Sequence, residues 1–194
     1  MNIIIFGAPG AGKGTQSDLL AKNFSLKKIS TGDLLREEIN NKSDLGKKIK
    51  DLIEKGQLVS DEIIIDLIEN IFKDQNKNFN FVFDGFPRTL KQAEILEKKL
   101  KNYNEKIDFV FNLEVNRDEI IKRISGRIFC TKCNKIFNNH FNSPLSSEHK
   151  CGDSYLKKRA DDTVEVVEKR YDTYIKQTAP LIKFYIEANN LHTV

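Results

Sequence analysis

The order of apolar and polar positions predicts strands that alternate with helices along the chain. Apolar runs at 3–6, 79–83 and 107–113 are short and unbroken, as expected for strands buried on both faces of a sheet. Residues 28–30 and 191–194 predict two shorter strands. We therefore predict an α/β fold with a parallel sheet covered on both faces. Apolar residues recur at helical spacing in 16–22, from 34 onward, and in 45–55, 61–73, 90–101, 117–125 and 162–185.

Single residues predict where several helices begin, end or bend. Thr31 or Asp33 is expected to cap the helix that begins near residue 34. Gly56 is expected to end the helix before it, and Pro180 to bend or interrupt the last helix.

The pattern changes at Gly126. Residues 127–158 are rich in Cys, Asn, Ser and Lys and lack helical spacing. We interpret them as a lobe of short strands and turns inserted into a single domain, which 194 residues are long enough to form.

Composition narrows the class of partner only slightly. The net charge of +4 suits nucleotides and nucleic acid alike, but acidic residues interrupt the basic ones and no aromatic stacking surface accompanies them, so we expect no nucleic acid partner. No apolar run approaches membrane-spanning length, and the first strand begins at the N-terminus, so we expect neither membrane association nor a signal peptide. Three clustered cysteines do not resemble a disulfide framework. We expect a cytoplasmic monomer.

A glycine-rich segment, 7–15, lies between the first strand and the first helix. Its Gly-x4-Gly-Lys spacing in a strand–turn–helix context is that of a phosphate-binding P-loop. Glycines let the backbone N–H groups turn inward, and Lys13 would reach the β- and γ-phosphates. The usual hydroxyl residue does not follow the lysine directly, since Gly14 intervenes before Thr15.

Two further polar segments follow predicted strands and so belong at the same edge of the sheet. They are 31–33 and 84–88. Asp84 stands where a carboxylate that organises Mg²⁺ would be expected, or it caps a turn. Phosphoryl transfer needs positive charge around the moving group, and six arginines near loops or helix ends could supply it, although lone arginines are more often surface residues. They are Arg36, Arg88, Arg123, Arg127, Arg159 and Arg170.

Five segments, in order and at matching spacing, resemble the motifs of the adenylate kinase family. They are 7–16, 30–36, 84–89 with Gln92, 159–162 and 178–181. The resemblance implies Mg²⁺-dependent transfer between ATP and AMP to give two ADP, in adenine nucleotide homeostasis and salvage. It also implies a P-loop three-layer fold, with a helical AMP-binding lobe at 30–59 and an inserted lid at 126–163.

The resemblance further implies roles at the matching positions. A ring of cations with one carboxylate would carry the transfer: Lys13, Arg88, Arg123, Arg127, Arg159, Arg170 and Asp84. ATP would contact the P-loop and lid, at Gly10, Ala11, Gly12, Lys13, Gly14, Thr15, Arg127, Ile136 and Phe137. AMP would contact Thr31, Arg36, Gln57, Leu58, Val59, Gly85, Phe86, Pro87, Arg88, Gln92, Arg159 and Arg170, with Thr31 and Gln92 favouring adenine over a pyrimidine.

The predicted lid carries all three cysteines. Cys130-x2-Cys133 is a common half-site for tetrahedral Zn²⁺, and Cys151 follows at a plausible spacing, so a structural zinc ion is expected. The fourth ligand is not a cysteine. Counting back from Arg159 puts Glu148 at the third ligand position, which we favour over Asp153 and then His149.

Two other functions remain compatible with the sequence: a kinase of CMP or UMP, and a nucleotide-binding module without turnover. Pyrimidine kinases usually have a short lid, whereas this one is long and carries cysteines. Adenylate kinases usually continue past the last strand with an Asp-Gly turn and one more helix that frames the ATP base, whereas this sequence stops at Val194.

Overall fold

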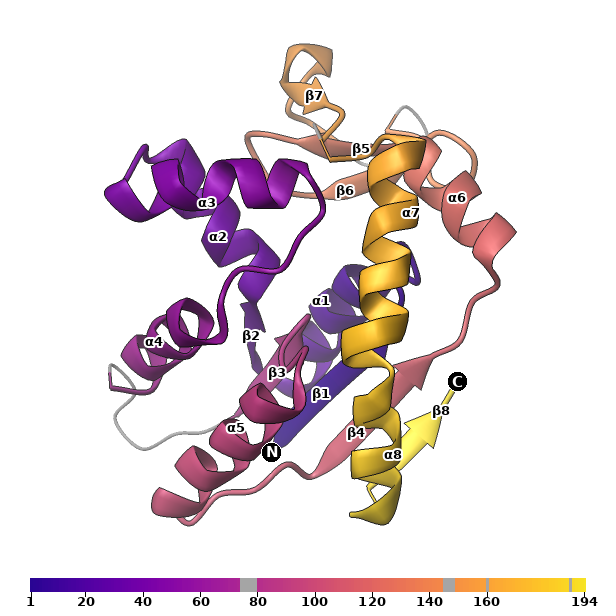
Figure 1. The fold of residues 1–194 in the computed structure, drawn as a ribbon. Coiled ribbons are helices and arrows are strands. Elements are labelled where there is room, and N and C mark those ends of the chain that lie inside the picture. Colours follow the sequence, from indigo (N-terminus) through magenta and orange to yellow (C-terminus); the bar gives the residue numbers. More distant parts are fainter. Residues whose placement is uncertain (74–79, 145–148, 160, 189) are drawn as a thin grey trace.

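A parallel sheet runs through the centre of the protein (Figure 1). The structure, a computed structural model, describes residues 1–73, 80–144, 149–159, 161–188 and 190–194. The sheet has the strand order β2-β3-β1-β4-β8, and every pair is parallel. Its strands are β1 (Asn2–Gly7), β2 (Lys27–Ser30), β3 (Phe81–Asp84), β4 (Phe109–Leu113) and β8 (Leu191–Thr193).

Helices lie on both faces of this sheet, as the sequence predicts. Their bounds are α1 (Lys13–Phe24), α2 (Thr31–Asn40), α3 (Asp44–Glu54), α4 (Asp61–Lys73), α5 (Leu90–Asn102), α6 (Arg117–Ser125), α7 (Val164–Thr173) and α8 (Pro180–Glu187). Alternate residues of β1 point to opposite faces of the sheet and pack in different hydrophobic cores. Ile4 and Phe6 pack in the larger core with α4, α5 and α8, whereas Ile3 and Ile5 pack with α1.

The predicted inserted lobe is a small antiparallel sheet of order β6-β5-β7, set apart from the main sheet beside the upper end of α7 (Figure 1). Its strands are β5 (Arg127–Cys130), β6 (Ile136–Asn138) and β7 (Leu156–Lys157), with a 3₁₀ turn at Asp153–Tyr155. Two predictions fall outside the described residues: the strand start at residue 79 and the metal ligand Glu148.

The start of α2 differs from the sequence prediction. Ser30, not Thr31 or Asp33, caps α2, because its extended backbone lets Oγ accept the Asp33 N–H at 3.3 Å. The Thr31 hydroxyl instead donates to the carbonyl of Gly85 at 2.7 Å.

The interruption predicted at Pro180 is confirmed. A π-helical turn, Tyr174–Thr178, separates α7 from α8, and the Ala179 N–H bonds the Tyr174 carbonyl five residues back. Proline lacks an N–H, so the helix restarts with Pro180 in its first turn, where no N–H is needed. Among the described residues, no helix is both long and apolar enough to cross a membrane.

Candidate functional site

Three polar segments meet at the carboxyl edge of the sheet, because the strands are parallel and in register. Ile5 pairs with Asp84, and Asp84 pairs with Ser30 on the other side. The glycine-rich loop after β1, the start of α2 and the segment after β3 are therefore neighbours. This is the crevice in which open α/β sheets bind ligands.

The glycine-rich loop has a backbone that side chains would obstruct. Gly10 has φ of +86°, and a Cβ there would lie 2.8 Å from the Ile124 Cγ1. Gly12, at φ +103°, is the N-cap of α1 and supplies no side-chain hydrogen bond. The first N–H groups of α1 thus have no side-chain cap, and an anion would satisfy them.

Lys13 is a buried cation beside this loop. Its Nζ donates to the carbonyls of Gly7 at 2.7 Å and Ala8 at 3.0 Å. Burial is the main cause that lowers the pKa of Lys13 to about 8, with Asp84 opposing and Arg88, among other arginines, adding to the fall. An anion in the crevice would hold the proton on this amine.

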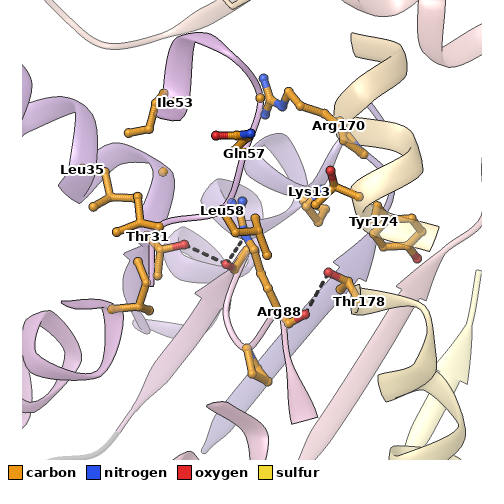
Figure 2. Close-up of a pocket in the computed structure, with 18 of the residues that line it drawn as sticks. Lys13, Thr31, Leu35, Ile53, Gln57, Leu58, Arg88, Arg170, Tyr174 and Thr178 are labelled. Carbon is orange, nitrogen blue, oxygen red and sulfur yellow. Dashed lines mark hydrogen bonds between the residues drawn. The ribbon is translucent and has the colours of Figure 1, made fainter. Parts of the chain in front are cut away.

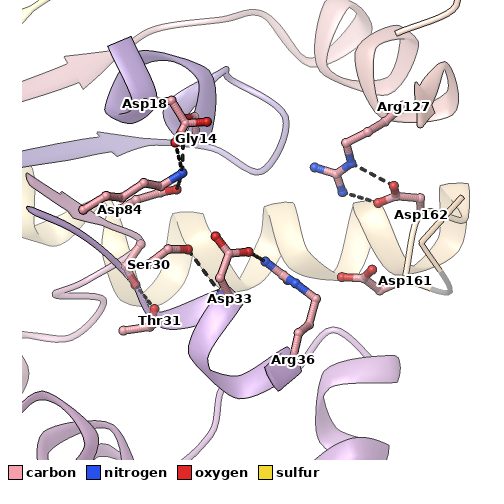
Figure 3. A network of polar contacts seen from close by, with 12 residues as sticks. Gly14, Asp18, Ser30, Thr31, Asp33, Arg36, Asp84, Arg127, Asp161 and Asp162 are labelled. Atoms are coloured by element: carbon pink, nitrogen blue, oxygen red, sulfur yellow. Dashed lines mark hydrogen bonds and ion pairs between the residues drawn. The ribbon is translucent and has the colours of Figure 1, made fainter. Parts of the chain in front are cut away.

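A second lysine, which the sequence analysis did not single out, reaches the same loop from β2. Lys28 Nζ donates to Asp18 at 2.7 Å and to the Gly14 carbonyl at 3.3 Å, and lies 3.9 Å from the Asp84 Oδ2 (Figure 3). The only signal in the sequence was its position two residues before Ser30, because residues two apart in a strand lie on the same face.

A cavity opens beside Lys13 and carries both charged and apolar walls (Figure 2). Its charged residues are four cations, Lys13, Arg36, Arg88 and Arg170, and one carboxylate, Asp161, which pairs with Arg170. Apolar residues from α2, α3, the loop before α4 and α4 itself also line it: Leu35, Ile53, Leu58, Val59 and Ile64. Thr31, Gln57, Gly85, Pro87 and Gln92 also line it. Such a cavity suits a molecule with an anionic end and a flat apolar end.

Arg88 is a half-buried cation of the cavity that is held through backbone carbonyls. Its Nε donates to the Gly85 carbonyl at 2.8 Å, and its own carbonyl accepts from Thr178 at 3.1 Å (Figure 2). Burial first, and then the charge of Arg170, lower its pKa to about 10. The side chain stays a cation at neutral pH, with no described carboxylate in a salt bridge to it.

Several predicted arginines pair with carboxylates around the crevice (Figure 3). Arg36 bonds Asp33, Arg127 makes a two-point contact with Asp162, and Arg170 bonds Asp161 at 2.6 Å. Arg123 bonds Glu119 at 2.9 Å and the Ala11 carbonyl at 3.2 Å, beside the glycine-rich loop. The Arg159 guanidinium lies 5.9 Å from the Phe129 ring centre, and burial, then Arg36, lower its pKa to about 10.

Two neighbouring residues of β6, Ile136 and Phe137, have different surroundings. Ile136 Cδ1 would lie 3.9 Å from a Cβ placed on Gly14, so Ile136 approaches the glycine-rich loop. Phe137 is buried, and its ring makes an edge contact with His149 at 4.8 Å between centroids. Of the two residues predicted to lie over a base, Ile136 is therefore the one that reaches the loop.

The three cysteines meet in the inserted lobe with His149. Ligand atoms of Cys130, Cys133, Cys151 and His149 all lie within 4.8 Å of one another. The His149 Nε2 is buried and bonds no described group. Burial raises the pKa of Cys130, but hydrogen bonds to its sulfur, that from the Cys133 backbone N–H first, outweigh it and lower the value to about 6.

This donor set fits a tetrahedral Zn²⁺ site. His149 is the candidate fourth ligand that the spacing ranks third, and Asp153, which it ranks second, is not part of the cluster. Glu148, the favoured fourth ligand, lies outside the described residues, so its role stays a prediction.

Comparison with known proteins matches nearly the whole chain. The adenylate kinase family model matches residues 5–190. Adenylate kinase of Pelagibacter ubique is 45% identical over 98% of this chain and 89% of its own length. That of Caldicellulosiruptor saccharolyticus is 47% identical over 95% and 86%, and that of Methanosarcina barkeri 43% over 100% and 90%.

Proposed function

This chain belongs to the adenylate kinase family, and from that premise we propose where its substrates bind and which residues move the phosphoryl group. The chain is a nucleoside monophosphate kinase that catalyses ATP + AMP ⇌ 2 ADP, with Mg²⁺ accompanying ATP. This membership favours AMP over a pyrimidine monophosphate as acceptor.

We propose that AMP occupies the cavity between α2, α3 and the segment after β3. The single observation that carries this assignment is the division of the cavity wall. Arg36, Arg88 and Arg170 lie close enough together that Arg170 and Arg36 lower the pKa of Arg88, and a phosphate would lie among them, whereas a purine ring would lie against the apolar residues of the wall. Gln57–Val59 would border the base, and Thr31 and Gln92 would offer it hydrogen bonds.

The ATP phosphates would bind the glycine-rich loop, where the first N–H groups of α1 and Lys13 lie together. Arg123 and Arg127 would approach from the inserted lobe side, and Ile136 would lie beside the loop. Asp84 and Asp33 would hold the water shell of the Mg²⁺ that enters with ATP, which neutralises phosphate charge.

In this proposal the transfer needs no general base, because an AMP phosphate oxygen is already a nucleophile. The residues position the two phosphates in line and balance their charge. Residues 30–59 and 126–163 would close over the nucleotides and exclude water, which would otherwise accept the phosphoryl group. On closure, substrate phosphates would replace Asp33, Asp161 and Asp162 as partners of the arginines.

The oligomeric state, the cellular location and the range of ligands belong to the same proposal. One copy of the chain carries both the glycine-rich loop and the cavity, and we propose that it acts as a monomer. We propose that the chain works in the cytoplasm with nucleotides as its ligands, without nucleic acid or a membrane.

Replacing Arg88 by alanine tests the AMP assignment. We expect the KM for AMP to rise at least about tenfold and the KM for ATP to change less than about threefold, because a buried charge-assisted contact to the AMP phosphate would be lost. Steady-state kinetics with each substrate varied in turn measure both constants. Arg117→Ala is the matched control, since that arginine pairs with Glu168 on the exposed surface. An equal rise in both KM values would contradict the assignment.

The lowered pKa of Lys13 predicts a pH-dependent ATP affinity. Bound phosphate favours the charged amine, so free protein must take up a proton on binding once the pH exceeds about 8. We expect ATP affinity to fall about tenfold from pH 7 to pH 9. Titration of Lys13→Arg should give a flat profile over this range, because a guanidinium does not titrate there. The same decline in that variant would assign the proton to another group.

A further inference from the structure

The side-chain amide of Gln92 is held on both sides. Gln92 is 2% exposed and borders the proposed AMP cavity. Its Oε1 accepts the backbone N–H of Arg88 at 2.8 Å, and its Nε2 donates to Asp61 Oδ1 at 2.7 Å. Thr89 Oγ1 donates to the same Asp61 oxygen at 3.1 Å and accepts the Gln92 N–H at 3.2 Å.

The two partners of this amide can each bond only one of its ends. A backbone N–H only donates, and a carboxylate only accepts. Turning the amide over would set its NH₂ against the Arg88 N–H and its oxygen against the Asp61 carboxylate. Both contacts would be repulsive, and buried polar groups would be left without partners. The structure therefore fixes which end of Gln92 is the acceptor.

That orientation matters because purines differ in the same way. The edge of adenine presents a donor at its 6-amino group beside an acceptor at N1. A 6-oxopurine presents an acceptor at O6 beside a donor at N1. A glutamine amide matches the first pattern in one orientation and the second when turned over. A residue that fixes the amide would thus decide which purine is accepted.

We propose that Asp61 is a positioning residue for base selection, which through Gln92 makes the site accept adenine and reject 6-oxopurines. This inference rests on the proposed AMP site. Asp61 does not line the cavity, so it acts without touching the nucleotide. It begins α4, two residues after the segment 57–59 that does line the cavity, and its bonds join the start of α4 to the start of α5.

The neighbouring residue offers a matched control. Glu62 is the next acid in the first turn of α4 and is exposed. It bonds Lys91 at 2.6 Å, which also joins α4 to α5, but no described contact connects it to Gln92. Glu62→Ala removes a helix-start charge and a tie between the same helices while leaving the amide held.

The experiment compares AMP with inosine monophosphate, which differs in its 6-oxo group and N1 hydrogen. Values of kcat/KM for both acceptors are measured with ATP as donor, together with thermal midpoints. We expect Asp61→Ala to lower the AMP:IMP ratio of kcat/KM at least tenfold, with IMP turnover rising. Asp61→Asn should keep the ratio within threefold, because its oxygen still accepts from Gln92. Glu62→Ala should leave the ratio unchanged.

A parallel loss of AMP and IMP activity in Asp61→Ala, with an unchanged ratio, would overturn the inference and make Asp61 a structural tie alone. Should that variant not fold, Asp61→Ser replaces it, because serine suits a helix start and its hydroxyl can donate as well as accept. A ratio at least threefold lower in Asp61→Ser would support the inference, and an unchanged ratio would overturn it. Failure of the AMP site itself would show separately, as a wild-type chain that prefers CMP or UMP to AMP.

Discussion

Replacing Lys13 by alanine is expected to lower kcat at least about 150-fold, which corresponds to about 3 kcal/mol of transition-state stabilisation. Lys13 is buried beside the glycine-rich loop, with two backbone carbonyls as partners and Asp84, Arg88, Arg127 and Arg170 close enough to shift its pKa. Its charge is thus already in place when the phosphoryl group moves. Water in its place would stabilise the transition state less, because it would have to reorient.

A coupled assay of ADP formation from ATP and AMP at saturating concentrations measures this loss. Lys22→Ala is the control, because Lys22 is an exposed residue in the last turn of the same helix. Lys13→Ala should keep the thermal midpoint, since burying a charge is unfavourable and its removal relieves that cost. A variant with near-normal kcat would remove Lys13 from the proposed mechanism.

Replacing Cys130 by serine is expected to remove bound zinc and to lower the thermal midpoint by about 10 °C. A metal bound only by the folded state, at about a thousand times its Kd, stabilises by about 4 kcal/mol, and each kcal/mol shifts a chain of this size by about 2–4 °C. Elemental analysis should give one zinc per wild-type chain and none in the variant, with a scan of unfolding on the same samples.

Three further samples make this test specific. A chelator should lower the wild-type midpoint and leave Cys130→Ser unaffected. Ser154→Ala, in the same lobe but outside the cluster, should keep both zinc and midpoint. His149→Ala should lose metal, whereas Glu148→Gln should keep it, if the observed cluster is the ligand set. Zinc loss in Glu148→Gln alone would restore the ligand predicted from spacing, and wild-type protein without zinc would contradict the site.

Much of the fold could be predicted from local patterns. The apolar run 3–6, the glycines after it and the helical spacing that follows are short-range features, and each has one low-energy backbone solution. The break at Pro180 was predicted for the same reason, since the missing N–H acts within one helical turn.

Other features depended on contacts that spacing cannot report. Ser30 caps α2, whereas the Thr31 hydroxyl bonds Gly85, 54 residues away in the sequence. His149 joins the cysteines because the antiparallel pairing of β5 with β7 brings the ends of the lobe together. Lys28 approaches Asp84 only through the register of β2 on β3.

The sequence alone determined the fold class, the phosphate-binding loop, the family and the cationic residues of the cavity, because these are encoded in runs of neighbouring residues. Only the tertiary structure decided which partner each polar side chain has. Arg36, Arg127 and Arg170 could equally have been surface residues, yet they face the crevice against Asp33, Asp162 and Asp161. Gln92 could be expected at a base, but its orientation is set by the Arg88 backbone N–H together with Asp61, 31 residues away. A hydrogen bond depends on distance and direction in space, and the folded chain supplies both only after distant segments have packed together.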